Sequence, residues 1–174
     1  RDLMEDFFLD FREAHLACEN ILIDLEHAPD NPDLLNSLFR SVHTIKGNLV
    51  YVGLKDLTPL IQSVEDVLDA VRKHNLIYDA SLSDVIMLAM DKTKLMVEAR
   101  MAEQPMPLSD EAQNRLCQQI SLIAEVKLAE RAQVVRDVLS QMDPSIVIAP
   151  PSPQPLNAPE PLTRQPEEHD ILQR

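Results

Sequence analysis

A run of apolar residues between positions 35 and 52, spaced alternately by three and four, most constrains what this chain can fold into. That spacing puts the apolar side chains on one face of a helix, as in helices that pack in a bundle. The whole chain has only two glycines and 3% aromatic residues, which argues against a sheet protein. The sequence therefore predicts an all-α fold, in which one helix buries a stripe made of Leu35, Leu38, Val42, Ile45, Leu49 and Val52.

Four amphipathic stretches predict an antiparallel four-helix bundle over residues 1–104. The expected helices cover about residues 2–27, 32–52, 58–72 and 81–103. Asn31 followed by Pro32 is a typical N-cap and first-turn pair for the second helix, and Gly53 is expected to be its C-cap. Residues 105–143 predict one additional helix, which Ser109 caps and which packs on or extends the bundle.

The last 31 residues differ from the rest in composition, because they hold eight of the 13 prolines. Residues 144–174 are therefore predicted to form a flexible, Pro-rich linker to a following domain. A proline-rich ligand for a small binding module is the alternative. Since the chain begins at Arg1 without a methionine and stops in this polar stretch, we expect it to be a piece of a longer protein.

Charge and hydropathy narrow the classes of partner. The net charge of −13 disfavours nucleic acid and anionic membrane surfaces, which would repel the chain. No apolar run approaches the roughly 20 residues of a membrane-spanning helix. Cys18 and Cys117 have no spacing typical of metal or redox sites, so we interpret both as buried small hydrophobes in a reducing compartment. The sequence predicts a cytoplasmic protein that binds neither nucleic acid nor membrane.

The second helix carries a histidine that faces away from the apolar stripe. His43 lies about 130° from the centre of the stripe, so its imidazole should stand in solvent. Gly47, one turn later, costs about 1 kcal/mol relative to alanine inside a helix, but it clears space beside the ring. Arg40 and Lys46, three residues to either side, bring positive charge. An exposed imidazole with steric room and nearby cations has the chemistry of a phosphorylatable histidine.

The order His43-x-x-Lys46-Gly47, with apolar Ile45 just before the lysine, resembles the histidine phosphotransfer (HPt) family. It is most similar to the N-terminal HPt domain of chemotaxis-type (CheA-like) histidine kinases. In that family a glutamate on the third helix hydrogen-bonds one ring nitrogen of the phospho-accepting histidine. The resemblance gives this role to Glu65, which the helical pattern puts at the boundary between core and solvent, and it leaves Nε2 free to attack phosphorus.

The resemblance also implies roles for other side chains. Lys46 would screen phosphoryl charge, and Gly47 would permit the close approach of a partner. Gln62 stands where chemotaxis-type kinases often have histidine, and it is a candidate for a further hydrogen bond. The surface that receives the partner is expected beside the histidine, formed by Phe39, Arg40, Val50 and Leu54.

The function that the resemblance implies is phosphoryl carriage in a bacterial two-component signalling system. His43 would accept a phosphoryl group from a histidine kinase ATP-binding domain or a receiver aspartate, and pass it to a response-regulator receiver domain. The receiver would supply the aspartate and Mg²⁺, so the chain would need no cofactor or metal of its own. We expect the fragment to be a monomer.

Three alternatives compete with this function, and the sequence argues against one of them, a metal-binding bundle. The chain could be the phospho-acceptor domain of a full chemotaxis-type histidine kinase; it holds no nucleotide-binding box, so whether the parent protein is an enzyme is undecided. A di-metal bundle would need Glu-x-x-His pairs, and none of the five histidines has a glutamate three residues before it. The third alternative is a non-catalytic helical interaction module.

Overall fold

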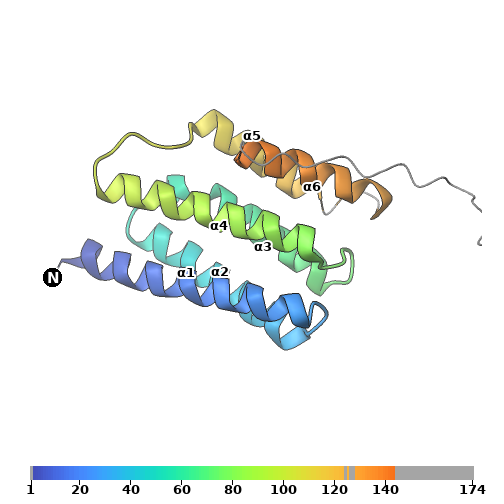
Figure 1. Ribbon diagram of the computed structural model, residues 1–174. Coiled ribbons are helices and arrows are strands. Elements are labelled where there is room, and N and C mark those ends of the chain that lie inside the picture. The colour runs from blue at the N-terminus through green and yellow to red at the C-terminus, as the bar shows by residue number, and fades with distance from the viewer. Residues whose placement is uncertain (1, 124, 126–127, 144–174) are drawn as a thin grey trace, which may run out of the picture.

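The computed structural model describes residues 2–123, 125 and 128–143. Within this part the chain forms α-helices, one short 3₁₀ helix and no strand (Figure 1). In chain order the elements are α1 (Leu3–His27), α2 (Pro32–Tyr51), η1 (Lys55–Leu57), α3 (Pro59–Arg72), α4 (Ala80–Met101), α5 (Asp110–Leu122) and α6 (Leu128–Met142). None of these helices is long and apolar enough to cross a membrane.

The first four α-helices form the bundle predicted from the apolar spacing. α2 packs against α1 and α3, and α4 closes the bundle by packing against the same two helices (Figure 1). The predicted stripe of α2 is buried from Leu35 to Leu49, and only its last member, Val52, is half-buried. Burial of such a stripe supplies most of the stability of a bundle helix. The fold class predicted from the sequence is therefore confirmed.

The ends of α2 follow from local sequence. The side-chain oxygen of Asn31 accepts hydrogen bonds from the backbone nitrogens of Asp33 and Leu34 at 3.0 and 3.1 Å, so it caps the first turn. α2 ends one residue earlier than predicted, because Val52 is the C-cap and Gly53 follows it in the left-handed region with φ +84°. Glycine adopts that conformation without steric cost. The two caps set where α2 begins and ends.

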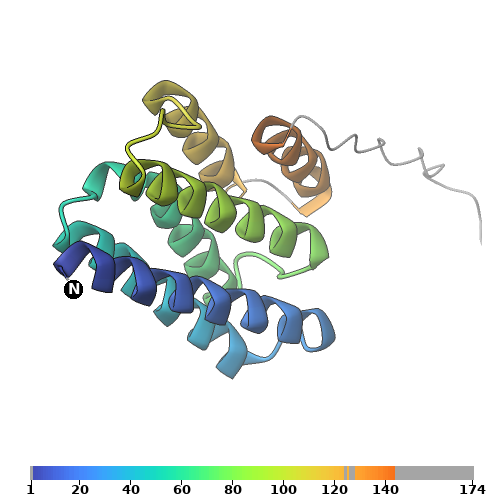
Figure 2. The ribbon, with the colours of Figure 1, turned by 60° about the vertical axis from the view of Figure 1, so that its left-hand side comes forward.

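The additional helix predicted over residues 105–143 is wrong in number, because this region forms two helices. α5 packs on α3, whereas α6 packs on α4, and one straight helix could not cover both (Figure 2). No proline or glycine occurs between Ser109 and Pro144, so the sequence carries no conventional signal for the break. Ser109 does cap α5, as predicted, by accepting a 3.1 Å hydrogen bond from the Ala112 nitrogen. The predicted linker at 144–174 lies outside the described residues.

Candidate functional site

The packing of α2 against α3 brings an exposed histidine next to a buried glutamate. The His43 side chain is 63% exposed, in agreement with its predicted position opposite the buried stripe. The Glu65 side chain is only 7% exposed, deeper than the boundary position that its place in the helical pattern predicts. Nδ1 of His43 and Oε1 of Glu65 are 2.8 Å apart. The contact joins residues that are 22 positions apart in sequence.

This contact defines which ring nitrogen is available. A carboxylate oxygen only accepts hydrogen bonds, so Nδ1 of His43 carries the proton in this geometry. Nε2 then has the free lone pair, on a ring that is largely exposed to solvent. A neutral imidazole held in one tautomer by a carboxylate is a nucleophile at its other nitrogen.

The second oxygen of Glu65 is bound to a lysine on α2. Nζ of Lys46 lies 2.6 Å from Oε2 of Glu65 and donates a further 3.0 Å hydrogen bond to Oε1 of Gln62. A buried carboxylate is costly unless it is paired, and here the lysine and the histidine share it. The amide nitrogen of Gln62 donates to Asp66 at 3.0 Å. The structure therefore joins Gln62 to Lys46 and Asp66, and Gln62 reaches the histidine only through the Lys46–Glu65 pair.

A second aromatic ring lies alongside the histidine. The ring of Phe39, one turn earlier on α2, is parallel to His43 within 9°, with 6.3 Å between centroids. This is an offset stack. The guanidinium of Arg72, from the end of α3, lies 4.2 Å from the centre of the Phe39 ring, within the range of a cation–π contact. We did not single out Arg72 from the sequence, although it lies seven residues after Glu65 and hence on the same face of α3.

Gly47 leaves open space beside the histidine. A Cβ atom added at this position would have no neighbour within 4 Å. Nothing that packs against Gly47 among the described residues therefore requires a glycine, and its helix-interior cost of about 1 kcal/mol is not offset by internal packing. The open space lies one helical turn from His43, on the same face of α2.

The expected docking residues divide into an exposed and a buried set. Arg40 is exposed, Phe39 is half-buried and Val50 is 48% exposed, so all three are accessible around His43. The assignment of Leu54 to this surface is wrong, because its side chain is 6% exposed and belongs to the core. The turn at Gly53 redirects the chain and points the next residue inward. Tyr51, which is 78% exposed, is an aromatic side chain at that end of α2 that sequence reasoning missed.

One other group of metal-ligating side chain types comes together in the described residues. Nδ1 of His15, on α1, lies 3.5 Å from Oε1 of Glu19, and its Nε2 lies 3.1 Å from Oδ1 of Asp91 on α4. The two carboxylates face opposite nitrogens of one buried ring. The ligand atoms that the three side chains offer nevertheless lie within 4.8 Å of one another, close enough to hold a metal ion, and the group links α1 to α4.

Comparison with known proteins agrees with this geometry. The family model of the Hpt domain matches residues 2–143, so the chain belongs to the Hpt domain family. It is a histidine phosphotransfer module of two-component signalling.

Three relatives are similar in sequence to the chain over about half of its length or more. It is 36% identical over 97 residues to the sensor histidine kinase CheAY of Helicobacter pylori, and 30% identical over 99 residues to the chemotaxis protein CheA of Treponema pallidum. These alignments cover 56% and 57% of the chain and 12% of each relative. The chemotaxis protein CheA of Rhizobium meliloti is 28% identical over 132 residues, 75% of the chain and 17% of that protein. The aligned part of the chain thus covers less than a fifth of the length of these relatives.

Proposed function

We propose that His43 is the residue that carries the phosphoryl group and that Nε2 is the attacking atom. The 2.8 Å contact between Nδ1 of His43 and Glu65 supports this most directly, since it fixes one tautomer and leaves Nε2 free. The 63% exposure of the ring and the open space at Gly47 support access by a second protein. Glu65 is a positioning residue, because it acts through the ring rather than on phosphorus.

The proposed phosphoryl transfer needs no general base from this chain. The Nε2 lone pair of His43 forms a bond to phosphorus, and the bond from phosphorus to the donor oxygen breaks, so the electron pair leaves with the donor. The donor is ATP held by a kinase domain or the acyl phosphate of a receiver aspartate. Positive charge develops on the imidazole as the bond forms, and the Glu65 carboxylate at Nδ1 stabilises it.

We propose two roles for Lys46, of which only the screening of phosphoryl charge was predicted from the sequence. Its ammonium is held by Glu65 and Gln62 and is 22% exposed, so its first effect is to keep the buried Glu65 in place. The same charge, one turn from His43, lowers the cost of bringing the phosphoryl oxygens to this face. Arg40, which is exposed three residues before the histidine, adds a second cation.

We propose that the chain accepts its phosphoryl group from the ATP-binding domain of a chemotaxis-type kinase and delivers it to a response-regulator receiver. The receiver would bring the accepting aspartate and Mg²⁺, while this chain would present a fixed nucleophile. The CheA names of the relatives support that kind of kinase.

Chemical phosphorylation tests the proposal without any partner. The chain is incubated with phosphoramidate, and the phosphorylated residue is located by peptide mass mapping under alkaline conditions. We expect one acid-labile phosphate on His43 and none in the His43→Gln variant. A folded, helical chain that stays unmodified at His43 would contradict the proposal.

A further inference from the structure

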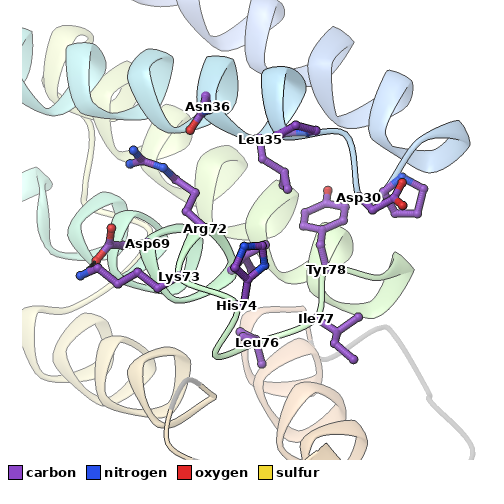
Figure 3. A pocket seen from close by; sticks show the side chains of 13 residues that line it. Asp30, Leu35, Asn36, Asp69, Arg72, Lys73, His74, Leu76, Ile77 and Tyr78 are labelled. Carbon is purple, nitrogen blue, oxygen red and sulfur yellow. Dashed lines mark ion pairs between the residues drawn. The ribbon is translucent and has the colours of Figure 1, made fainter.

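A cavity lies at one end of the bundle, where the connection between α1 and α2 meets the connection between α3 and α4 (Figure 3). Its volume is about 720 Å³, within the range of pockets that hold ligands. Its apolar lining includes the buried side chains of Leu35, Leu76 and Tyr78. It is therefore large enough, and apolar enough, to accept a side chain of another molecule.

Basic side chains line this cavity where α3 ends, and the carboxylates of Asp30 and Asp69 line it as well. Arg72, Lys73 and His74 are consecutive, and all three line it. Lys73 is already paired, at 2.5 Å, with Asp69. The structure gives the Arg72 guanidinium no carboxylate partner among the described residues, and its recorded contact is the Phe39 ring.

The cavity continues the His43 surface along two helices. Asn36, which lines the cavity, lies seven residues before His43 on α2, and Arg72 lies seven residues after Glu65 on α3. Seven residues are close to two helical turns, so each pair shares a face and is separated by about 10 Å along the axis. Phe39 spans the gap, since it contacts both Arg72 and His43. A protein large enough to cover His43 therefore reaches the cavity.

We infer that this cavity is a second docking site for the protein that exchanges the phosphoryl group with His43, and that it takes an acidic segment of that partner. A carboxylate of the segment pairs with Arg72, and a neighbouring apolar side chain enters between Leu76 and Tyr78. The inference rests on the proposed function. Charge favours an acidic occupant on the Arg72 side of the cavity, because this guanidinium has no carboxylate partner among the described residues and the rest of the acidic chain repels such a segment. Of the two carboxylates that line the cavity, Asp69 is paired with Lys73, and Asp30 comes from the connection between α1 and α2.

The direct test is an NMR titration of this chain with a synthetic acidic peptide. The probe is the acetylated, amidated tetrapeptide Asp-Leu-Phe-Glu, and the control peptide carries Asn and Gln in place of its two acids. We expect saturable shifts at Arg72, Leu76 and Tyr78. The affinity should fall by about tenfold or more for the control peptide and for Arg72→Glu, and Arg72→Lys should recover part of it.

The matched control is a second arginine that lies over a phenylalanine. The guanidinium of Arg12 lies 5.8 Å from the centre of the Phe8 ring on α1, outside the cavity. Arg12→Glu makes the same change in net charge and disrupts the same kind of contact, so this variant should bind the peptide as the unsubstituted chain does. Equal weakening by both variants would reduce the effect to net charge and overturn the inference.

A transfer assay then connects the cavity to the phosphoryl partner. Excess acidic peptide should slow discharge of phospho-His43 onto a receiver domain more than it slows loading by phosphoramidate, which needs no docking. A chain that loads His43 but shows no saturable peptide binding overturns this inference alone. A chain that binds the peptide but never loads His43 overturns the proposed function instead.

Discussion

Two histidines of this chain meet carboxylates in opposite ways. His15 is buried, and a partly exposed carboxylate faces each of its ring nitrogens: Glu19 at Nδ1 and Asp91 at Nε2. His43 is exposed, and one buried carboxylate, that of Glu65, holds one of its nitrogens. The first ring has no nitrogen open to a second molecule, whereas the second has one.

The difference shows that exposure of the ring and burial of its partner have separate effects. A buried acceptor such as Glu65 is fixed by the packing around it, so it can fix the orientation of a ring that is itself in solvent. The solvent-facing edge of the His43 ring is then free for chemistry. In His15 the ring is fixed by the core, and the carboxylates are the accessible groups.

The strongest test of this contrast exchanges each histidine for glutamine. His43→Gln should abolish loading by phosphoramidate and leave the melting temperature close to that of the parent chain, because the side chain is exposed. His15→Gln should keep the loading rate and lower the free energy of unfolding by about 1–3 kcal/mol, since it disturbs a buried polar contact. Loss of loading in the His15 variant, with its helicity intact, would break the contrast.

The next test closes the open side of His43. Gly47→Leu should reduce phosphoryl transfer to a receiver domain by more than about tenfold, since a bulky side chain then occupies the space where a partner approaches. It should also stabilise the helix, by up to about 1 kcal/mol, because glycine is a poor helix former. Transfer kinetics and thermal melts measure the two effects. Full transfer by this variant would show that the open space has no role in access.

A further test removes the carboxylate that holds Nδ1 of His43. Glu65→Gln removes the charge that stabilises the imidazole. It also leaves one amide oxygen to accept the hydrogen bonds from Lys46 and His43 that two carboxylate oxygens accept in Glu65. We expect loading by phosphoramidate to slow by about tenfold, with helicity retained. Asp91→Asn, which removes the same charge beside His15, is the matched control and should load at the parent rate. An unchanged rate for Glu65→Gln would remove that residue from the site.

The smallest effect extends the contrast between buried and accessible groups to the thiols. Burial raises the pKa of Cys18 to about 12, while Cys117 is only half-buried and burial raises its pKa as well. Cys117 should therefore react with iodoacetamide faster than Cys18 near neutral pH. Because the folded state favours the neutral Cys18 thiol, this stabilising contribution is complete below its ordinary value of 9.0 and is lost as pH rises toward 12. Faster labelling of Cys18 would contradict the burial.

The bundle and the centre of the site could be predicted because both depend on helical spacing. The stripe of α2 predicts its buried face, and the position of His43 opposite that stripe follows from the same angle. The pairing of His43 with Glu65 came from a family resemblance, since spacing within one helix says nothing about contacts between two. The depth of Glu65 was underestimated, because packing of α2 on α3 covers more of the helix boundary than the pattern indicates.

The features that sequence reasoning missed depend on how separate segments meet. Arg72 over Phe39 joins α3 to α2, and His15 beside Asp91 joins α1 to α4, so neither follows from one segment alone. Leu54 turns inward only because Gly53 adopts a positive φ, which the sequence allows but does not require. The break between α5 and α6 is set by two different packing surfaces, α3 and α4, rather than by a helix-breaking residue.

One measurement tests the central claim most directly: long-range ¹H–¹⁵N and ³¹P NMR of the chain, labelled with ¹⁵N in histidine and loaded with phosphoramidate. The account predicts phosphorus bonded to Nε2 of His43, with Nδ1 still protonated and held by Glu65. Phosphorus on Nδ1 of His43, or on any other histidine, would contradict it.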